Sequence, residues 1–157
     1  MNNFKLAVEL TLQKEGVLSD HKDDAGGLTK YGISKAAYPT LDIANLTKEQ
    51  AIALYKRDYW EKAQCDEIPY PLDVMLFDTA VNHGVTKAVK ILQESLGVAA
   101  DGVMGQKTRA AARTAKNSIY TVFMINRLYA YTAAKSWTTF KEGWKNRLVA
   151  LAQEVDA

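Results

Sequence analysis

The sequence contains little cysteine, proline or histidine, and each scarcity excludes a class of structure. Its 157 residues hold one cysteine, Cys65, so neither an intramolecular disulfide nor a Cys-x-x-Cys metal site can form. A chain of this kind is suited to a reducing compartment. Three prolines and nine glycines argue against long disordered linkers. His21 and His83 are the only histidines, so we expect no metal site and no cofactor.

Long apolar runs are also missing. The first residues lack the apolar core of a signal peptide, because Glu9, Gln13 and Lys14 interrupt them. No stretch approaches the length of a transmembrane span. The net charge of +2 identifies no partner by itself, and we expect no nucleic-acid ligand. The hydrophobic share of 48% and the charged share of 24% are those of a globular domain.

The pattern of apolar residues predicts a mainly α fold with a small β element. Helical spacing of Phe4, Ala7, Val8 and Leu12 predicts a first helix over 3–14, which Gly16 would end. Residues 17–34 hold three glycines and three aspartates among short apolar pieces, which indicates a loop with a small β-hairpin.

From Thr47 the chain reads as helical nearly to its end. Thr47 and Gln50 fit a capping box, and the prolines at 69 and 71 separate this helix from the next. Further helices are expected over 72–83, 86–96, 106–116, 118–136 and 139–155. Between them, Asp101-Gly102-Val103-Met104-Gly105 is typical of a turn, and the structural need for its glycines explains it sufficiently.

Carboxylates gather around the end of the first predicted helix. Glu15 stands where helix meets polar loop, and Asp20, Asp23, Asp24 and Thr29 follow. Cleavage of a glycosidic bond needs a proton donor and a second group that handles water or the sugar cation. A hairpin that folds back would bring Asp24 and Thr29 opposite Glu15. By the spacing alone, solvated charges and turn-capping aspartates are the more common explanation of such a cluster.

Ordered motifs around these residues resemble the signature of glycoside hydrolase family 108, which contains phage endolysins and bacterial N-acetylmuramidases. The motifs are Glu15-Gly16-x-x-Ser19-Asp20, Asp24-x-Gly26-Gly27-x-Thr29-x-x-Gly32-Ile33, Leu46-Thr47-x-x-x-Ala51, Tyr55-x-x-Asp58-Tyr59-Trp60 and Phe77-Asp78-x-Ala80-Val81-Asn82-His83-Gly84. A later motif, Asp101-Gly102-x-Met104-Gly105-x-x-Thr108, resembles the associated peptidoglycan-binding region. The resemblance implies a lysozyme-like domain over 1–87 and a helical binding region over 88–157. At this chain length we expect the two to pack closely rather than to be joined by a flexible tether.

The resemblance also implies roles for single residues. Glu15 occupies the place of the family's catalytic acid, which opens an E-G-G-Y motif, although Val17-Leu18 replaces Gly-Tyr here. By likeness to phage-type lysozymes, Asp24 and Thr29 would orient or activate the attacking water. A carboxyl gap of about 6.5–9.5 Å would favour inversion and one of about 5–5.5 Å retention, which the sequence leaves open. The expected substrate-binding residues are Asp20, His21, Tyr31, Asn82 and His83.

The implied activity is cleavage of the β-1,4 bond between N-acetylmuramic acid and N-acetylglucosamine in peptidoglycan. Lytic transglycosylase, chitinase and non-catalytic wall-binding protein are the alternatives. The endolysin likeness implies a monomer that accumulates in a host cytoplasm and is released by a separate holin-type membrane protein.

Other conspicuous residues have structural interpretations. His83 is expected to cap a helix or support the cleft, and His21 to be exposed. Trp60 is expected to pack in the core, as are Trp137, Phe140 and Trp144 on the last helices. A run of basic residues predicts a solvated face or an attraction to anionic wall polymers. It comprises Lys87, Lys90, Lys107, Arg109 and Arg113.

Overall fold

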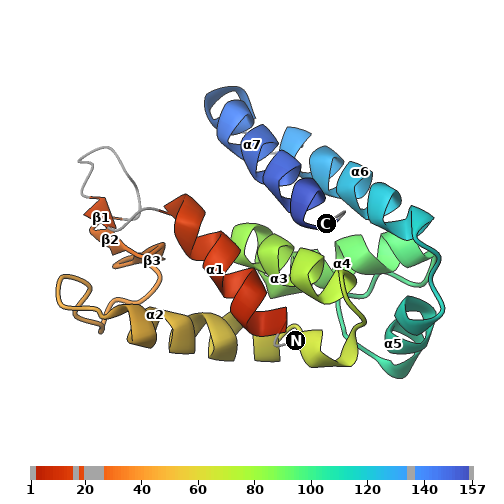
Figure 1. The fold of residues 1–157 in the computed structure, drawn as a ribbon, viewed down its shortest axis with the longest axis horizontal. Helices are drawn as coiled ribbons and strands as arrows, with labels where there is room; N and C mark the ends of the chain where they lie inside the picture. The colour runs from red at the N-terminus through yellow and green to blue at the C-terminus, as the bar shows by residue number, and fades with distance from the viewer. Residues whose placement is uncertain (1–2, 16–17, 20–26, 134–136, 156–157) are drawn as a thin grey trace. The chain divides into compact units, whose positions relative to one another are not determined.

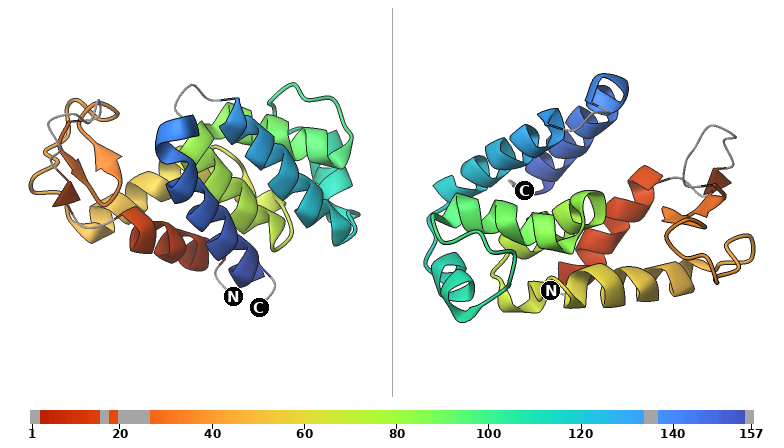
Figure 2. Two further views of the ribbon diagram at one scale, coloured as in Figure 1. Left: turned by 90° about the horizontal axis from the view of Figure 1, so that it is seen from above. Right: turned by 180° about the vertical axis from the view of Figure 1, so that it is seen from behind.

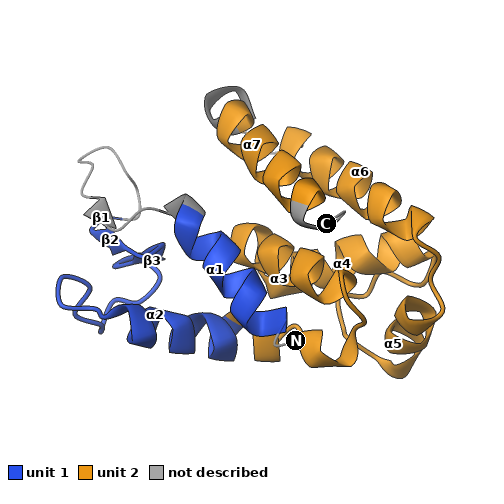
Figure 3. Ribbon diagram, in the orientation of Figure 1, with its two compact units in different colours: residues 1–58 blue, residues 59–157 orange. Residues whose placement is uncertain are grey.

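The computed structural model describes residues 3–15, 18–19, 27–133 and 137–155 (Figure 1). The side chains of residues 14–15, 18–19, 137–140 and 154–155 lie outside this description. The chain divides into two compact units, Met1–Asp58 and Tyr59–Ala157, here unit 1 and unit 2 (Figure 3).

Unit 1 combines helices with a small sheet. Its elements are α1 (Asn3–Glu15), β1 (Leu18–Ser19), β2 (Thr29–Lys30), β3 (Ile33–Ser34) and α2 (Lys48–Tyr55). The strands form an antiparallel sheet in the order β1-β2-β3, with Thr29 opposite Ser34. Tyr31 and Gly32 join β2 to β3 with φ of 53° and 75°, and positive φ at both positions suits a tight hairpin. The predicted small β element over 17–34 is thereby confirmed.

The start of α2 shows the predicted capping box. The Gln50 N–H donates to the Thr47 hydroxyl at 3.2 Å, and the Thr47 N–H donates to the Gln50 amide oxygen at 2.9 Å. Ala51 and Tyr55 form the buried face of the helix. The chain then continues into a π-helical turn, η1 (Lys56–Glu61), and a short 3₁₀ turn, η2 (Cys65–Glu67).

Unit 2 is a bundle of helices around α3. Its helices are α3 (Leu72–His83), α4 (Val85–Leu96), α5 (Gln106–Arg113), α6 (Ser118–Thr132) and α7 (Trp137–Val155). The first nine residues of α3 are all buried, as expected for a helix enclosed on every side. Helix α4 packs against α3, α6 against α4, and α7 runs back beside α6 (Figures 1 and 2).

The core of unit 2 confirms the role predicted for Trp60. Its ring is 2% exposed and lies 5.7 Å from that of Phe77, and its indole N–H donates to Asp66 at 2.9 Å. Trp144 stacks on Tyr131 at 4.6 Å, so it also packs, although it is half-buried. The side chains of Trp137 and Phe140 lie outside the described part of the chain.

The fold class is mainly α, as predicted, with small differences at helix ends. Helix α5 ends at Arg113, before the predicted 116, and α6 ends at Thr132, before the predicted 136. Gly84 and Gly97 end α3 and α4 with φ of 82° and 68°, where a side chain would be strained. Among the helices that the structure describes, none is long and apolar enough to cross a membrane.

Candidate functional site

The predicted catalytic acid is the last residue of α1. Glu15 ends this helix, and its carboxylate lies outside the described side chains. Asp20, His21 and Asp24 also lie outside the described residues. Of the predicted carboxylates at 15, 20 and 24, the structure therefore gives the backbone position of Glu15 alone.

Thr29 and Tyr31 belong to the hairpin of unit 1. Thr29 lies on β2, and its hydroxyl donates to the carbonyl oxygen of Gly27 at 3.2 Å. The carbonyl oxygen of Tyr31 accepts a hydrogen bond of 3.0 Å from the hydroxyl of Tyr55, a buried residue of α2. The Lys30 ammonium donates to the carbonyl oxygen of Ala44 at 2.9 Å. These bonds attach the hairpin to α2 and the loop before it, and so place Thr29 and Tyr31.

Asn82 and His83 form the end of α3 in unit 2. The Asn82 amide donates to the Asp78 carbonyl oxygen at 2.7 Å, one helical turn earlier. The His83 ring lies 4.4 Å from the ring of Tyr131 on α6. Burial, and then the positive charge of Arg127, lower the pKa of His83 to about 4. At neutral pH the imidazole is therefore uncharged, and it can bind a neutral sugar hydroxyl or amide without contributing a charge.

Buried ion pairs join α3, close to its end, to helices α6 and α7. Asp78 forms ion pairs with Arg127 of α6 at 2.6 Å and with Arg147 of α7 at 3.0 Å. Arg127 is fully buried and also donates to the Tyr131 hydroxyl at 2.9 Å. We call these residues the ionic network: Asp78, Arg127, Tyr131 and Arg147. The sequence pattern did not predict this network, although Asp78, within a mostly apolar stretch of α3, was a signal that a buried cation pairs with it.

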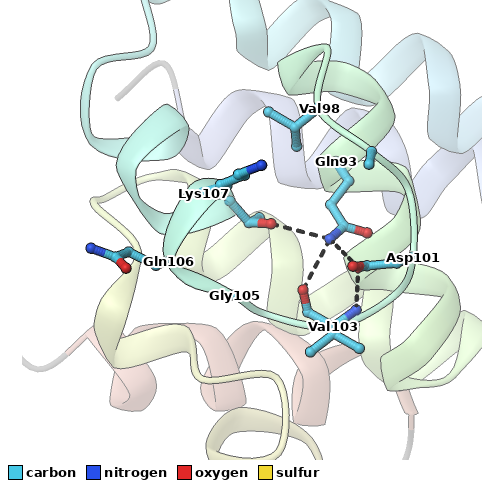
Figure 4. Close-up of a pocket in the computed structure, with 9 residues that line it drawn as sticks. Gln93, Val98, Asp101, Val103, Gly105, Gln106 and Lys107 are labelled. Atoms are coloured by element: carbon cyan, nitrogen blue, oxygen red, sulfur yellow. Dashed lines mark hydrogen bonds between the residues drawn. The ribbon is translucent and has the colours of Figure 1, made fainter.

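A pocket of about 320 Å³ opens beside the turn between α4 and α5 (Figure 4). We call it the α4–α5 pocket. It is lined by Gln93, Val98, Ala99, Asp101, Val103, Gly105, Gln106, Lys107 and Thr108. All of these residues belong to unit 2. The predicted turn motif thus forms one wall of a cavity as well as connecting two helices.

Gln93 organises this turn from inside the bundle. Its amide nitrogen lies within hydrogen-bond distance of the Asp101 carboxylate (2.8 Å), the Val103 carbonyl (3.0 Å) and the Thr108 hydroxyl (3.1 Å). Its oxygen accepts from the Gly102 N–H at 2.8 Å. Gln93 is 1% exposed, so these partners replace the water it has lost. We call Gln93 and its four partners the amide network.

Gly102 of the amide network tolerates no side chain. Its φ is +81°, and an added Cβ would lie 2.8 Å from a methyl carbon of Thr86. The prediction that the turn itself requires Gly102 is therefore confirmed.

The predicted basic run separates into two groups. Arg109 donates to the Met104 carbonyl at 3.0 Å and to Gln64 at 2.9 Å, and Arg113 pairs with Glu67 at 3.0 Å. These two arginines tie α5 to η2 and its N-cap residue. The three lysines of the run are exposed. Lys107 alone of the three lines the α4–α5 pocket.

The described part of the chain contains neither a cluster of metal ligands nor a reactive thiol. No group of three or more His, Cys, Asp or Glu side chains gathers there in a way that could hold a metal ion. Cys65 is buried, and burial raises the pKa of its thiol well above the usual range, which keeps it protonated and unreactive.

The sequence matches two known protein families. Residues 8–84 match the family model of glycosyl hydrolase 108, and residues 87–149 match one described as a predicted peptidoglycan domain. No curated protein matches the chain. Among solved structures, SagA of Brucella abortus is similar, with 32% sequence identity and a TM-score of 0.88. The match covers 97% of this chain and 92% of that one.

Proposed function

Because the chain belongs to the glycosyl hydrolase 108 family, we propose that it cleaves the β-1,4 bond between N-acetylmuramic acid and N-acetylglucosamine, with Glu15 as general acid. It is a glycosidase that acts on peptidoglycan, since a peptidoglycan domain follows the hydrolase region. The observation that carries the finer proposal is the place of Glu15. It ends α1, within the matched residues, just before the small sheet.

Glu15 must hold a proton near neutral pH to donate it to the departing glycosidic oxygen. Apolar surroundings would raise its pKa enough for this, while Asp24 in a polar setting would stay ionised. Thr29 already donates its hydroxyl proton to Gly27, so its oxygen lone pairs are suited to accept from a water molecule. Asp24 and Thr29 would hold this water for attack at the sugar carbon as the bond to the leaving oxygen breaks.

We assign the remaining predicted residues to substrate binding. Tyr31 and Thr29 lie on one short hairpin, and Asn82 and His83 share the last turn of α3. The uncharged His83 suits the neutral hydroxyl and acetamido groups of the glycan. Asp20 and His21 are proposed for the same role by resemblance alone.

We also propose residues 1–87 as the hydrolase region and 88–157 as the binding region, packed together. The ionic network supports this packing, because Asp78 belongs to the first region and its two arginines to the second. Expression of 88–157 alone should give a protein with markedly less helix by circular dichroism than its share of the whole chain. A fully helical fragment would contradict shared packing.

Substitution of the acid tests the proposed chemistry. Glu15→Gln should lower the release of reducing sugars from purified peptidoglycan by at least about a hundredfold, because a general acid contributes roughly 10²–10⁴ in rate. Glu9→Gln is the matched control, since Glu9 is an exposed residue of the same helix. Full activity of a folded Glu15→Gln protein would refute the assignment.

The products of the same digest separate the alternative activities. Hydrolysis leaves reducing N-acetylmuramic acid ends, whereas a lytic transglycosylase leaves anhydro-muramic ends, which mass spectrometry resolves. Cleavage of chitin oligomers at a rate matching that on peptidoglycan would favour a chitinase. Binding to peptidoglycan without any new ends would indicate a wall-binding protein.

We further propose, by likeness to phage endolysins, a monomer that accumulates in a host cytoplasm until a holin-type protein releases it. Expression in a bacterium should then lyse the cells only when a membrane-permeabilising protein is co-expressed. Lysis without that protein would contradict this part of the proposal.

A further inference from the structure

We propose that the α4–α5 pocket binds the peptide part of peptidoglycan, at an amino-acid group that carries both a free ammonium and a free carboxylate. The polymer's identity rests on the proposed function. The choice of peptide over glycan, and of a zwitterionic group within it, rests on the pocket itself.

Asp101 provides a fixed negative charge on one wall. Its Oδ1 accepts from the Val103 N–H and from the Gln93 amide, both at 2.8 Å. These two bonds, the first larger in effect, lower the pKa of Asp101, so the exposed carboxylate is charged at any pH near neutrality. A carboxylate whose orientation is already set loses little entropy when it binds an ammonium group.

Lys107 provides the opposite charge from the first turn of α5. Figure 4 shows its side chain reaching toward Val98 and Gln93, whereas the amide of Gln106 points away from the pocket. The N-cap residue of α5 is Gly105, which has no side chain to cap the helix. The N–H groups of this turn therefore add to the attraction of Lys107 for a carboxylate.

Apolar side chains also line the pocket. They belong to Val98, Ala99 and Val103, and Val103 is 64% exposed. A pocket with apolar side chains beside a carboxylate and an ammonium suits the carbon chain of an amino acid that carries the complementary charges. None of the nine residues lining the pocket is aromatic. A sugar ring, which is neutral and binds well on an aromatic face, would leave both charges unused.

The size of the pocket agrees with this ligand. A volume of about 320 Å³ is near the lower limit for small-molecule sites, and it fits one or two amino-acid residues. Peptide stems of cell walls that contain diaminopimelate carry such a zwitterionic end wherever it is not cross-linked.

Titration of the full chain with defined peptides tests the proposal. The probe is N-acetyl-L-alanyl-γ-D-glutamyl-meso-diaminopimelate, in which the far end of the diaminopimelate is a free amino acid. Two analogues remove one charge each, by N-acetylation of that amino group or by amidation of its carboxylate. Binding is followed by calorimetry and by NMR shifts of the residues lining the pocket.

Each protein charge is paired with one ligand charge. Asp101→Asn keeps an acceptor for Val103 and Gln93 and should weaken the probe about tenfold, but leave the affinity for the N-acetylated analogue unchanged. Lys107→Gln should weaken the probe by about the same factor and leave the affinity for the amidated analogue unchanged. Lys116→Glu, an exposed lysine outside the pocket, is the control and should bind the probe normally.

Three outcomes would overturn the proposal. The wild type could fail to bind the probe, or both variants could bind it with wild-type affinity. In the third outcome, each variant loses as much affinity for its matched analogue as for the probe. Glu15→Gln tests the catalytic proposal separately, because it should bind the probe with wild-type affinity while releasing reducing sugars at least about a hundredfold more slowly. Peptide binding by a wild type that cleaves no glycan would refute the proposed function and leave the pocket assignment standing.

Discussion

Unit 2 contains two polar networks, one built around buried ion pairs and one around the buried amide of Gln93, and they hold the helices in different ways. The ionic network joins α3 to α6 and α7, and its Asp78–Arg147 hydrogen bond spans 69 residues of chain. The amide network holds one turn, and its longest bond spans 15 residues. The first therefore determines how distant helices pack, and the second determines the local path of the chain around a pocket.

The networks also differ in how their bonding capacity is used. Both nitrogen hydrogens and the oxygen of Gln93 have partners. Arg127, by contrast, has buried Nε and Nη1 atoms without a hydrogen-bond partner among the described residues. A buried charge depends strongly on its counter-ion, whereas a satisfied amide depends on several weaker bonds. The ionic network should therefore be the more sensitive of the two to a single substitution.

The largest effect is expected from removing the charge of Asp78. Asp78→Asn keeps the size of the side chain but leaves two buried guanidinium groups without this counter-ion. The free energy of unfolding should fall by about 3–5 kcal/mol. Urea denaturation followed by circular dichroism measures it, with Glu94→Gln on the exposed face of α4 as control. A loss as small as that of the control would show that the ion pairs contribute little.

A smaller effect is expected from removing the amide of Gln93. Gln93→Leu leaves the Gly102 N–H and three acceptors without their partner, and the free energy of unfolding should fall by about 2–4 kcal/mol. The same denaturation experiment applies, with Gln13→Leu on the exposed face of α1 as control. If Gln93→Leu lowers the free energy of unfolding more than Asp78→Asn does, the expected order of the two networks is reversed.

The smallest effect concerns acid. The pKa of His83 is about 4 in the folded protein, below its ordinary value of 6.5, so the unfolded chain takes up the proton first. Stability should be constant above about pH 6.5 and should fall as the pH is lowered toward 4, by about 1–2 kcal/mol once solvent screening is allowed for.

His83→Gln is the control for this titration, because it removes the ionisable group. Its unfolding free energy should change less than that of the wild type between pH 6.5 and 4.5. Asp101, in the amide network, has a lowered pKa, so its contribution is present above its unfolded pKa near 3.8 and is lost only below it. Hydrogen exchange should therefore show acid loosening the end of α3 before the α4–α5 turn. The opposite order would contradict the assignment.

Much of the fold followed from local sequence signals. The capping box at Thr47 and Gln50, the glycines that end α3 and α4, and the turn at 101–105 were predictable because neighbouring residues satisfy each other's backbone groups. The ends of α5 and α6 were predicted too late, since apolar spacing does not register where a helix stops packing.

The candidate site was predictable only in part. Ordered motifs proposed Glu15 and its companions as candidates, and the structure supplies hydrogen bonds of Thr29, Tyr31 and Asn82. The pairing of Arg109 with Gln64 and of Arg113 with Glu67 was not predicted, because these partners lie 45 and 46 residues earlier in the chain. The spacing of residues within a helix does not indicate which distant residues will pair with it.

The sequence by itself determined the family, the mainly α class and the position of Glu15 at a helix end, because these depend on residue order and short-range bonding. Only the tertiary structure decided that Asp78, Arg127 and Arg147 share one buried cluster, and that Asp101 and Lys107 face one pocket. Both depend on which helices pack together. That packing is driven by the burial of apolar surface, which is a non-directional effect. The spacing of the charged residues along the chain therefore does not show which of them the packing brings together.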